Sequence, residues 1–267
     1  MISKRAAPLM HCFVLGWRET WTQRVPLAGT FLSFAVMIAV WASVWRLVPP
    51  ATLSRASLSY AAVIWYFTAA EIVAFSLGHC YRRVENLLQG GDVLLHLVRP
   101  VSFVTLTTAE ELGHVMAKIA LVAAPGAGLA YGLTGTVPVR PALVLPLLLL
   151  LVGGAALYLV AQMLIGLTAA WFGTARPVFF ITQKFLFVLG GLVVPLSAYP
   201  EALQRIAWLT PFPAMLYAPA SLALDRSVAH AAAMLAVQML WLAVAAAALH
   251  ALGAAFERRI TLRGLDG

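Results

Sequence analysis

Four charged side chains interrupt apolar segments of the sequence and are the first candidates for chemistry. Glu71 lies in one apolar segment, and Glu110, Glu111 and Lys118 lie in another. Charged residues at membrane depth are costly and usually face protein or water, so they mark ion or substrate pathways. Glu71 is too short to reach the interface and needs a partner or a water-filled cavity. Two arrangements stay open. In one, Glu71 pairs with Lys118. In the other, Glu110, Glu111 and Lys118 have structural roles, with Glu111 paired to Lys118 or the glutamates solvated at the membrane surface.

Catalytic and metal-binding patterns are absent from the sequence. The six histidines have no metal-ligand spacing, and no nucleophile elbow or paired-carboxylate motif occurs. Cys12 and Cys80 form neither a metal motif nor a disulfide framework, and we expect both to remain thiols. The chain also lacks a G-x-x-x-x-G-K-[ST] loop, so a transporter built from it must take its ATPase from another chain.

The elements that hold these residues are membrane-spanning helices, according to the composition. The 267 residues are 62% hydrophobic and only 10% charged, whereas a soluble domain carries about a quarter charged residues. The uncharged blocks are roughly 20 residues long or longer, enough to cross a hydrocarbon core of about 30 Å. The net charge of +8 comes from basic residues scattered between these blocks, which indicates membrane topology and excludes a nucleic-acid partner.

We expect an all-α integral membrane protein that forms a single transmembrane domain over residues 1–267. Residues 1–24 suit an amphipathic helix in the membrane interface. Six spans follow, at about 25–45, 58–79, 104–131, 142–172, 178–196 and 228–256. The stretch 197–226 is broken by prolines into pieces too short to span and is expected to form short re-entrant helices.

Basic residues set the expected orientation. With a cytoplasmic N-terminus, twelve of the 18 Lys and Arg residues fall inside and five outside, Lys118 being within a span. The positive-inside rule therefore predicts that both termini are cytoplasmic.

Two sequence stretches resemble signatures of type-two ABC exporter permeases. Residues 84–100 read VENLLQGGDVLLHLVRP and are similar to the family's loop between its second and third spans. Residues 190–200 (GGLVVPLSAYP) and 209–219 (LTPFPAMLYAP) resemble its proline-rich segment before the last span. The subgroup most resembled is the daunorubicin- or multidrug-type permeases, with Gln89 and Thr210 as departures.

The resemblance implies a partner and a site for it. Two ATPase subunits, which bind the ATP and Mg, would dock on a cytoplasmic coupling loop at residues 81–103 through a helix in a groove. The coupling residues it indicates are Arg82, Arg83, Glu85, Gly90, Gly91, Asp92, Arg99 and Pro100. No cofactor is expected in this chain itself.

The resemblance also implies a path for the substrate across the bacterial cytoplasmic membrane. A second permease, identical or related, would share with this chain an outward path for an amphipathic or hydrophobic substrate. Its expected lining residues are Trp41, Trp65, Phe67, Glu71, Phe185 and Phe187. The re-entrant segment would close the extracellular side, with Pro195, Pro200, Pro211, Phe212 and Pro219 shaping it.

Two other functions remain open at this stage. An ion-coupled secondary carrier would use Glu71 as its titrating acid, and a scaffold subunit would not transport at all. The loop signature argues against both, by family resemblance rather than by physics.

Overall fold

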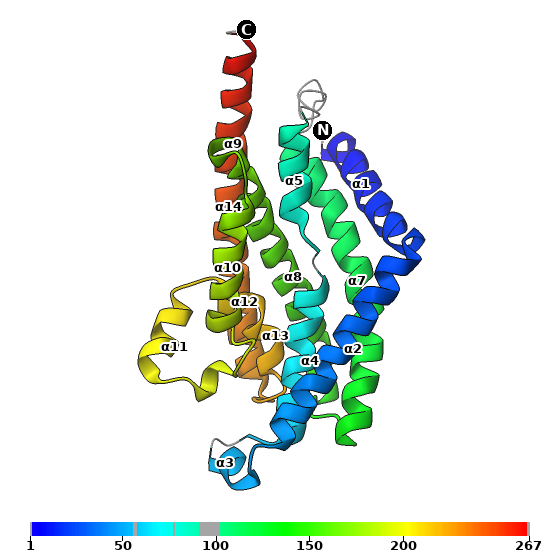
Figure 1. The fold of residues 1–267 in the computed structure, drawn as a ribbon, viewed down its shortest axis with the longest axis vertical. Helices are drawn as coiled ribbons and strands as arrows, with labels where there is room; N and C mark the ends of the chain where they lie inside the picture. Colours follow the sequence, from blue (N-terminus) through cyan, green and yellow to red (C-terminus); the bar gives the residue numbers. More distant parts are fainter. Residues whose placement is uncertain (1, 56–57, 77, 91–101, 266–267) are drawn as a thin grey trace.

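The computed structural model describes residues 2–55, 58–76, 78–90 and 102–265 as an array of helices (Figure 1). Its α-helices are α1 (Ile2–Thr22), α2 (Arg24–Arg46), α3 (Pro50–Arg55), α4 (Tyr60–Ser76), α5 (Cys80–Gln89), α7 (Phe103–Thr134), α8 (Val144–Leu167), α9 (Ala169–Phe172), α10 (Arg176–Leu189), α11 (Glu201–Trp208), α12 (Phe212–Met215), α13 (Tyr217–Ser221) and α14 (Val228–Leu265). Two 3₁₀ turns cover Pro141–Leu143 and Leu196–Ala198.

Among the described residues, five helical stretches are long and apolar enough to cross a membrane. They are Arg24–Arg46, Tyr60–Gln89, Phe103–Thr134, Pro141–Phe172 and Val228–Phe256. This confirms the expected all-α membrane protein. Both α1 and the end of α14 lie at the end of the bundle that holds α5 and α9, opposite α3 (Figure 1).

The expected span at 178–196 is the exception. Here α10 has 14 residues, which at 1.5 Å per residue gives about 21 Å, short of the hydrocarbon thickness. The helix stops because Gly190 is followed by Gly191, whose φ of 77° belongs to the left-handed region. The structure therefore leaves the six-span count unconfirmed.

The second expected span also differs from the prediction, because the helix breaks and starts again. α4 ends at Ser76, and α5 begins at Cys80 and packs on α8. Gln162 of α8 satisfies the broken backbone, since its Nε2 donates to the Gly78 carbonyl (3.1 Å) and its Oε1 accepts from the Tyr81 N–H (3.4 Å). The first half of the expected coupling loop is thus a helix packed on the bundle.

Helix α1 packs along α7, where the two backbones touch. A Cβ atom on Gly113 would overlap the Phe13 carbonyl, and one on Gly16 would overlap the Glu110 carbonyl. Small residues allow helices to approach this closely. One face of α1 is therefore covered by protein, and its place at the membrane surface stays a prediction.

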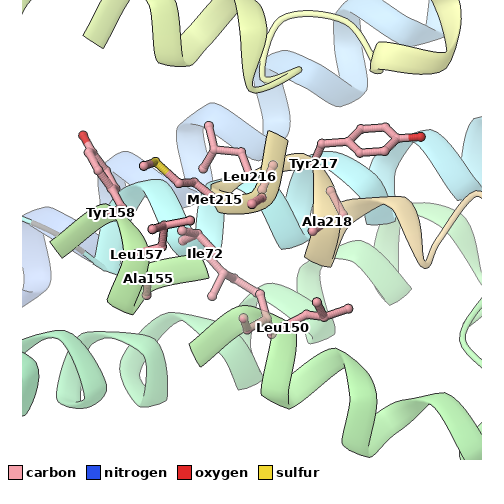
Figure 2. Packing of buried hydrophobic residues seen from close by; sticks show 14 of the residues in the cluster. Ile72, Leu150, Ala155, Leu157, Tyr158, Met215, Leu216, Tyr217 and Ala218 are labelled. Carbon is pink, nitrogen blue, oxygen red and sulfur yellow. The ribbon is translucent and has the colours of Figure 1, made fainter. Parts of the chain in front are cut away.

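The proline-rich segment forms short helices, as expected from its sequence. Pro195 precedes the second 3₁₀ turn, Pro200 precedes α11, Pro211 and Phe212 open α12, and Pro219 lies inside α13. The buried α12–α13 part packs against α4 and α8, with Met215, Leu216 and Ala218 next to Leu150 and Ile72 (Figure 2). Gln238 of α14 secures it by donating to the Ala214 carbonyl at 2.9 Å and the Leu150 carbonyl at 3.0 Å.

Candidate functional site

An apolar cavity of about 610 Å³ lies between α2, α4 and α10, and we call it the membrane cavity. Three of the expected path residues, Trp41, Glu71 and Phe187, line it together. Its other walls are mostly aromatic and aliphatic, including Met37, Phe75, Tyr158, Phe179, Leu186 and Leu192. A concave apolar space with a few polar groups is the usual form of a binding site for a small molecule.

Glu71 is held in the wall of the membrane cavity by Trp41. The Trp41 Nε1–H donates to Glu71 Oε1 at 2.8 Å, and the Glu71 residue is only 2% exposed. The Trp41 ring stacks on Phe67 with centroids 4.3 Å apart, so Phe67 supports the cavity wall from behind. The open alternative of a Glu71–Lys118 ion pair is wrong, because the ion pairs between described residues do not include it.

The remaining expected path residues point elsewhere. Trp65 donates its Nε1–H to the Thr136 carbonyl at 2.8 Å, near the end of α7. Phe185 is 53% exposed and lies on the outer face of α10. Neither residue lines the membrane cavity.

A second cavity of about 400 Å³ adjoins the first, and we call it the polar cavity. The two cavities share Thr30, Gly78, His79 and Lys118. The break between α4 and α5 lies at this junction, which puts the backbone of Gly78 in both linings. We call the two adjoining cavities together the hollow; its polar part is the polar cavity, and its mostly apolar part is the membrane cavity.

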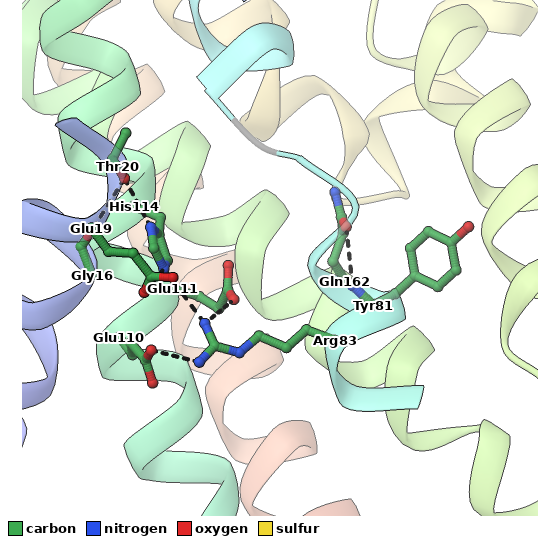
Figure 3. A network of polar contacts seen from close by, with 9 residues as sticks. All are labelled: Gly16, Glu19, Thr20, Tyr81, Arg83, Glu110, Glu111, His114 and Gln162. Atoms are coloured by element: carbon green, nitrogen blue, oxygen red, sulfur yellow. Dashed lines mark hydrogen bonds and ion pairs between the residues drawn. The ribbon is translucent and has the colours of Figure 1, made fainter. Parts of the chain in front are cut away.

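The polar cavity is bounded by a charged cluster that joins three helices (Figure 3). Arg83 of α5 contacts Glu110 of α7 (Nη2–Oε1, 2.5 Å) and Glu111 of α7 (Nη1–Oε1, 3.0 Å). His114 of α7 shares a hydrogen bond with Thr20 of α1 (Nδ1–Oγ1, 2.8 Å). The cluster therefore ties α1, α5 and α7 together on the side chains of five residues.

This cluster supplies partners that the sequence did not indicate. Arg83, whose expected role at the ATPase contact stays a prediction, has both of its terminal nitrogens engaged inside the chain. Glu111 pairs with Arg83 and not with Lys118. Glu19 Oε2 also approaches His114 Nε2, at 3.7 Å.

The clustering needs no metal ion to explain it. Glu19, Glu110 and His114 each have one ligand-type atom within 4.8 Å of the others. However, the Arg83 guanidinium already contacts Glu110 and offsets its charge. The arrangement is that of an ion-paired junction between helices.

The other coupling residues lie on the helix surface, in the bundle interior, or outside the part of the chain that the structure describes. Glu85 is buried and accepts a hydrogen bond from the Ala175 N–H at 3.2 Å, which links α5 to the start of α10. Arg82 and Gly90 are exposed. Gly91, Asp92, Arg99 and Pro100 lie outside the described residues.

Sequence reasoning missed several residues that shape the site. Gln162, inside a helix with no charged residue, is one of them, and its isolated polarity in an apolar block was the available signal. His114 lies one turn after Glu110 and so on the same face of α7, a spacing that also could have been read. Gly16 and Gly113 carried no such signal, because their role depends on which helices meet.

One comparison with known protein families gives a match. The family described as "ABC-2 family transporter protein" matches residues 52–257. The match includes α4, α7, α8, α10 and α14 up to residue 257, and α1 and α2 lie before it. No curated protein matches the chain.

Proposed function

The chain belongs to the ABC-2 family of transporter proteins, and from this premise we propose that it is the permease subunit of an exporter for amphipathic or hydrophobic substrates. Membership makes it a multi-pass membrane transport component without an ATPase domain, so the chain is not itself an enzyme. ABC ATPase subunits are the partners that the family implies. We further propose that transport is outward, and that the complex contains two ATPase copies and a second permease.

The joined cavities support a substrate path in this subunit. The polar cavity is lined by the junction of α1 with α2 and by the break between α4 and α5, and it shares four lining residues with the mostly apolar membrane cavity. A substrate with a polar head and an apolar body matches this gradient. Alternating access would then expose the hollow first to one side and then to the other.

A second permease would face the side on which the membrane cavity lies, between α2 and α10. The outer face of α10 is apolar and exposed at Phe180, Ile181, Phe185 and Val188. Within the described residues, α10 makes its more extensive contacts with α8, α11 and α12. A partner subunit on this face would cover these residues and complete the path.

Coupling to the ATPase would run through α5 and the residues that follow it. Arg82 and Gly90 are exposed near the end of α5, and the family resemblance continues through Asp92 and Arg99 to Pro100. A helix docked in a groove of the ATPase would transmit motion driven by ATP and Mg binding there. Through Arg83 and Glu85, that motion would reach α7, α1 and α10.

The excess of basic residues on one side supports an orientation with both termini inside, and the resemblance to exporter permeases supports a location in the bacterial cytoplasmic membrane. Membrane lipids would then surround the exposed apolar faces of α2 and α14.

Affinity purification in mild detergent from the native host, followed by mass spectrometry, tests this function. We expect an ABC ATPase subunit with a Walker motif to accompany the tagged chain, with or without a second permease. Recovery of the intact chain alone, while a control ABC complex survives the same detergent, would contradict it. Glu71-dependent ion-coupled transport would then be the function to test.

A further inference from the structure

Among the residues that the structure describes, Lys118 is a cation without a carboxylate partner, and it lies at the junction of the two cavities. It lines both cavities, and the ion pairs within the described part of the chain do not include it. Its Nζ lies 3.1 Å from the point that a Cβ atom on Gly78 would occupy, so the glycine leaves room for the ammonium group. The Lys118 side chain is half-buried.

The acidic residues around Lys118 are already engaged with other groups. Glu111 pairs with Arg83 at 3.0 Å, and Glu71 accepts the hydrogen bond of Trp41 at 2.8 Å. Glu19, the other acid of the polar cavity, faces His114 at 3.7 Å. Among the described lining residues, Lys118 is therefore left as a cation available to a ligand in the hollow.

The surroundings of Lys118 suit the head group of an amphiphile. His79, Thr30 and Gln183 lie in the cavity lining with it and supply further hydrogen-bonding groups. Beyond them the membrane cavity is lined by Met37, Trp41 and Phe187, which suit an aliphatic or aromatic body. A half-buried ammonium binds an anionic oxygen through a charge-assisted hydrogen bond, about twice as strong as a neutral one.

We propose that Lys118 selects substrates with an anionic head group, such as a phosphate monoester, whose apolar body occupies the membrane cavity. This inference rests on the proposed permease function and specifies its substrate class. The head would lie at the junction between Lys118 and Gly78, and the body would extend toward Trp41. Lys118 is then a specificity-determining contact.

Binding to the purified full-length complex in phosphatidylcholine nanodiscs tests the inference. The probes are dodecyl phosphate, dodecyltrimethylammonium and inorganic phosphate, each measured by isothermal titration. We expect dodecyl phosphate to bind about tenfold tighter than dodecyltrimethylammonium, the size of one charge-assisted contact. Inorganic phosphate, which has no apolar body, is expected not to bind measurably.

Two substitutions of Lys118 test whether the preference for the anionic probe depends on this residue. Lys118→Met is expected to abolish the preference for the anion, and Lys118→Arg to keep it. Lys184→Met serves as the matched control, because Lys184 is an exposed lysine of α10 that lines neither cavity. Equal behaviour of Lys118→Met and Lys184→Met would overturn the inference, as would tighter binding of the cation or equal binding of inorganic phosphate.

A crosslinking measurement on the unmodified complex gives a second test that needs no variant to fold. An analogue of dodecyl phosphate with a photoreactive tail is expected to label peptides of α2, α4 or α10, and labelling only elsewhere would refute the site. The ATPase content of the same sample separates failure of the proposed exporter function from failure of the proposed role of Lys118. A sample without ATPase subunits contradicts the exporter function, whereas a sample with them but without an anion preference contradicts only the role of Lys118.

Discussion

Arg83 of α5 donates to Glu111 of α7 at 3.0 Å, although 28 positions separate the two residues. Arg83 also contacts Glu110 at 2.5 Å, so one guanidinium connects α5 to two consecutive residues of α7. Because α5 leads into the expected ATPase contact, this junction joins the coupling segment to the helix that carries Lys118.

Arg83→Met is expected to destabilise the folded permease by about 1–3 kcal/mol. The loss leaves Glu110 and Glu111 uncompensated, and the estimate is reduced from that of a fully buried pair because the Arg83 side chain is 37% exposed. Thermal unfolding in detergent measures it. Arg82→Met, an exposed neighbour whose guanidinium contacts Tyr81, is the control and is expected to change little.

Trp41→Phe is expected to lower the free energy of unfolding by about 1–3 kcal/mol. The phenyl ring keeps the stacking on Phe67 but leaves the buried Glu71 oxygen without its donor. Glu71→Gln retains an acceptor and is expected to cost less. Trp65→Phe removes a similar donor at an exposed site, where water replaces it. Equal losses in Trp41→Phe and Trp65→Phe would show that the Trp41–Glu71 bond has no special role.

Gly113→Ala is expected to separate α1 from α7, since the added methyl group would overlap the Phe13 carbonyl. Limited proteolysis of the N-terminal helix reports the separation as faster cleavage. Gly128→Ala, on the same helix with open space around it, is the control and gains up to about 1 kcal/mol of helix propensity. Unchanged proteolysis in both variants would refute the close packing of the two helices.

Gln162→Leu is expected to lower stability by about 1–3 kcal/mol for each backbone group that it leaves unsatisfied, Gly78 C=O and Tyr81 N–H. The break between α4 and α5 lies at the cavity junction, so we also expect weaker coupling between ATP hydrolysis and transport. Gln204→Leu, which removes a hydrogen bond to the Tyr199 carbonyl in the proline-rich segment, should leave coupling intact. A permease that couples normally after Gln162→Leu would argue against a role for the break.

Charge reversal at Asp92 or Arg99 is expected to uncouple transport from ATP hydrolysis while the protein remains inserted. Both residues lie in the loop that resembles the family's ATPase contact. ATPase activity and transport, measured together in proteoliposomes, report the effect. Normal coupling in both variants would exclude this loop as the docking segment.

Much of the fold was predictable because hydrophobicity is a property of a local window. The spans near 25–45, 104–131, 142–172 and 228–256 correspond to α2, α7, α8 and α14. The short helices between Pro200 and Pro219 followed from proline chemistry. The structure departs from the expected spans at 178–196 and 81–90, where a left-handed glycine and a glutamine from another helix decide where helices stop and start.

The candidate site was predictable only in part. Trp41, Glu71 and Phe187 were expected on one path, and they line one cavity. Their partners were not foreseen, since Glu71 meets an indole and Glu111 meets Arg83. An acid in an apolar segment indicates that a partner is required, but several candidates had the right depth.

The sequence by itself determined that this chain crosses a membrane, that it has no ATPase loop, and which family it belongs to. These properties depend on composition and on the order of short motifs. The tertiary structure alone decided that Arg83 joins α5 to α7, that Gly16 and Gly113 allow α1 to pack on α7, and that Lys118 faces a hollow without a carboxylate partner within the described residues. The physical reason is that helix faces far apart in sequence find their neighbours through packing, and packing decides which polar groups are satisfied.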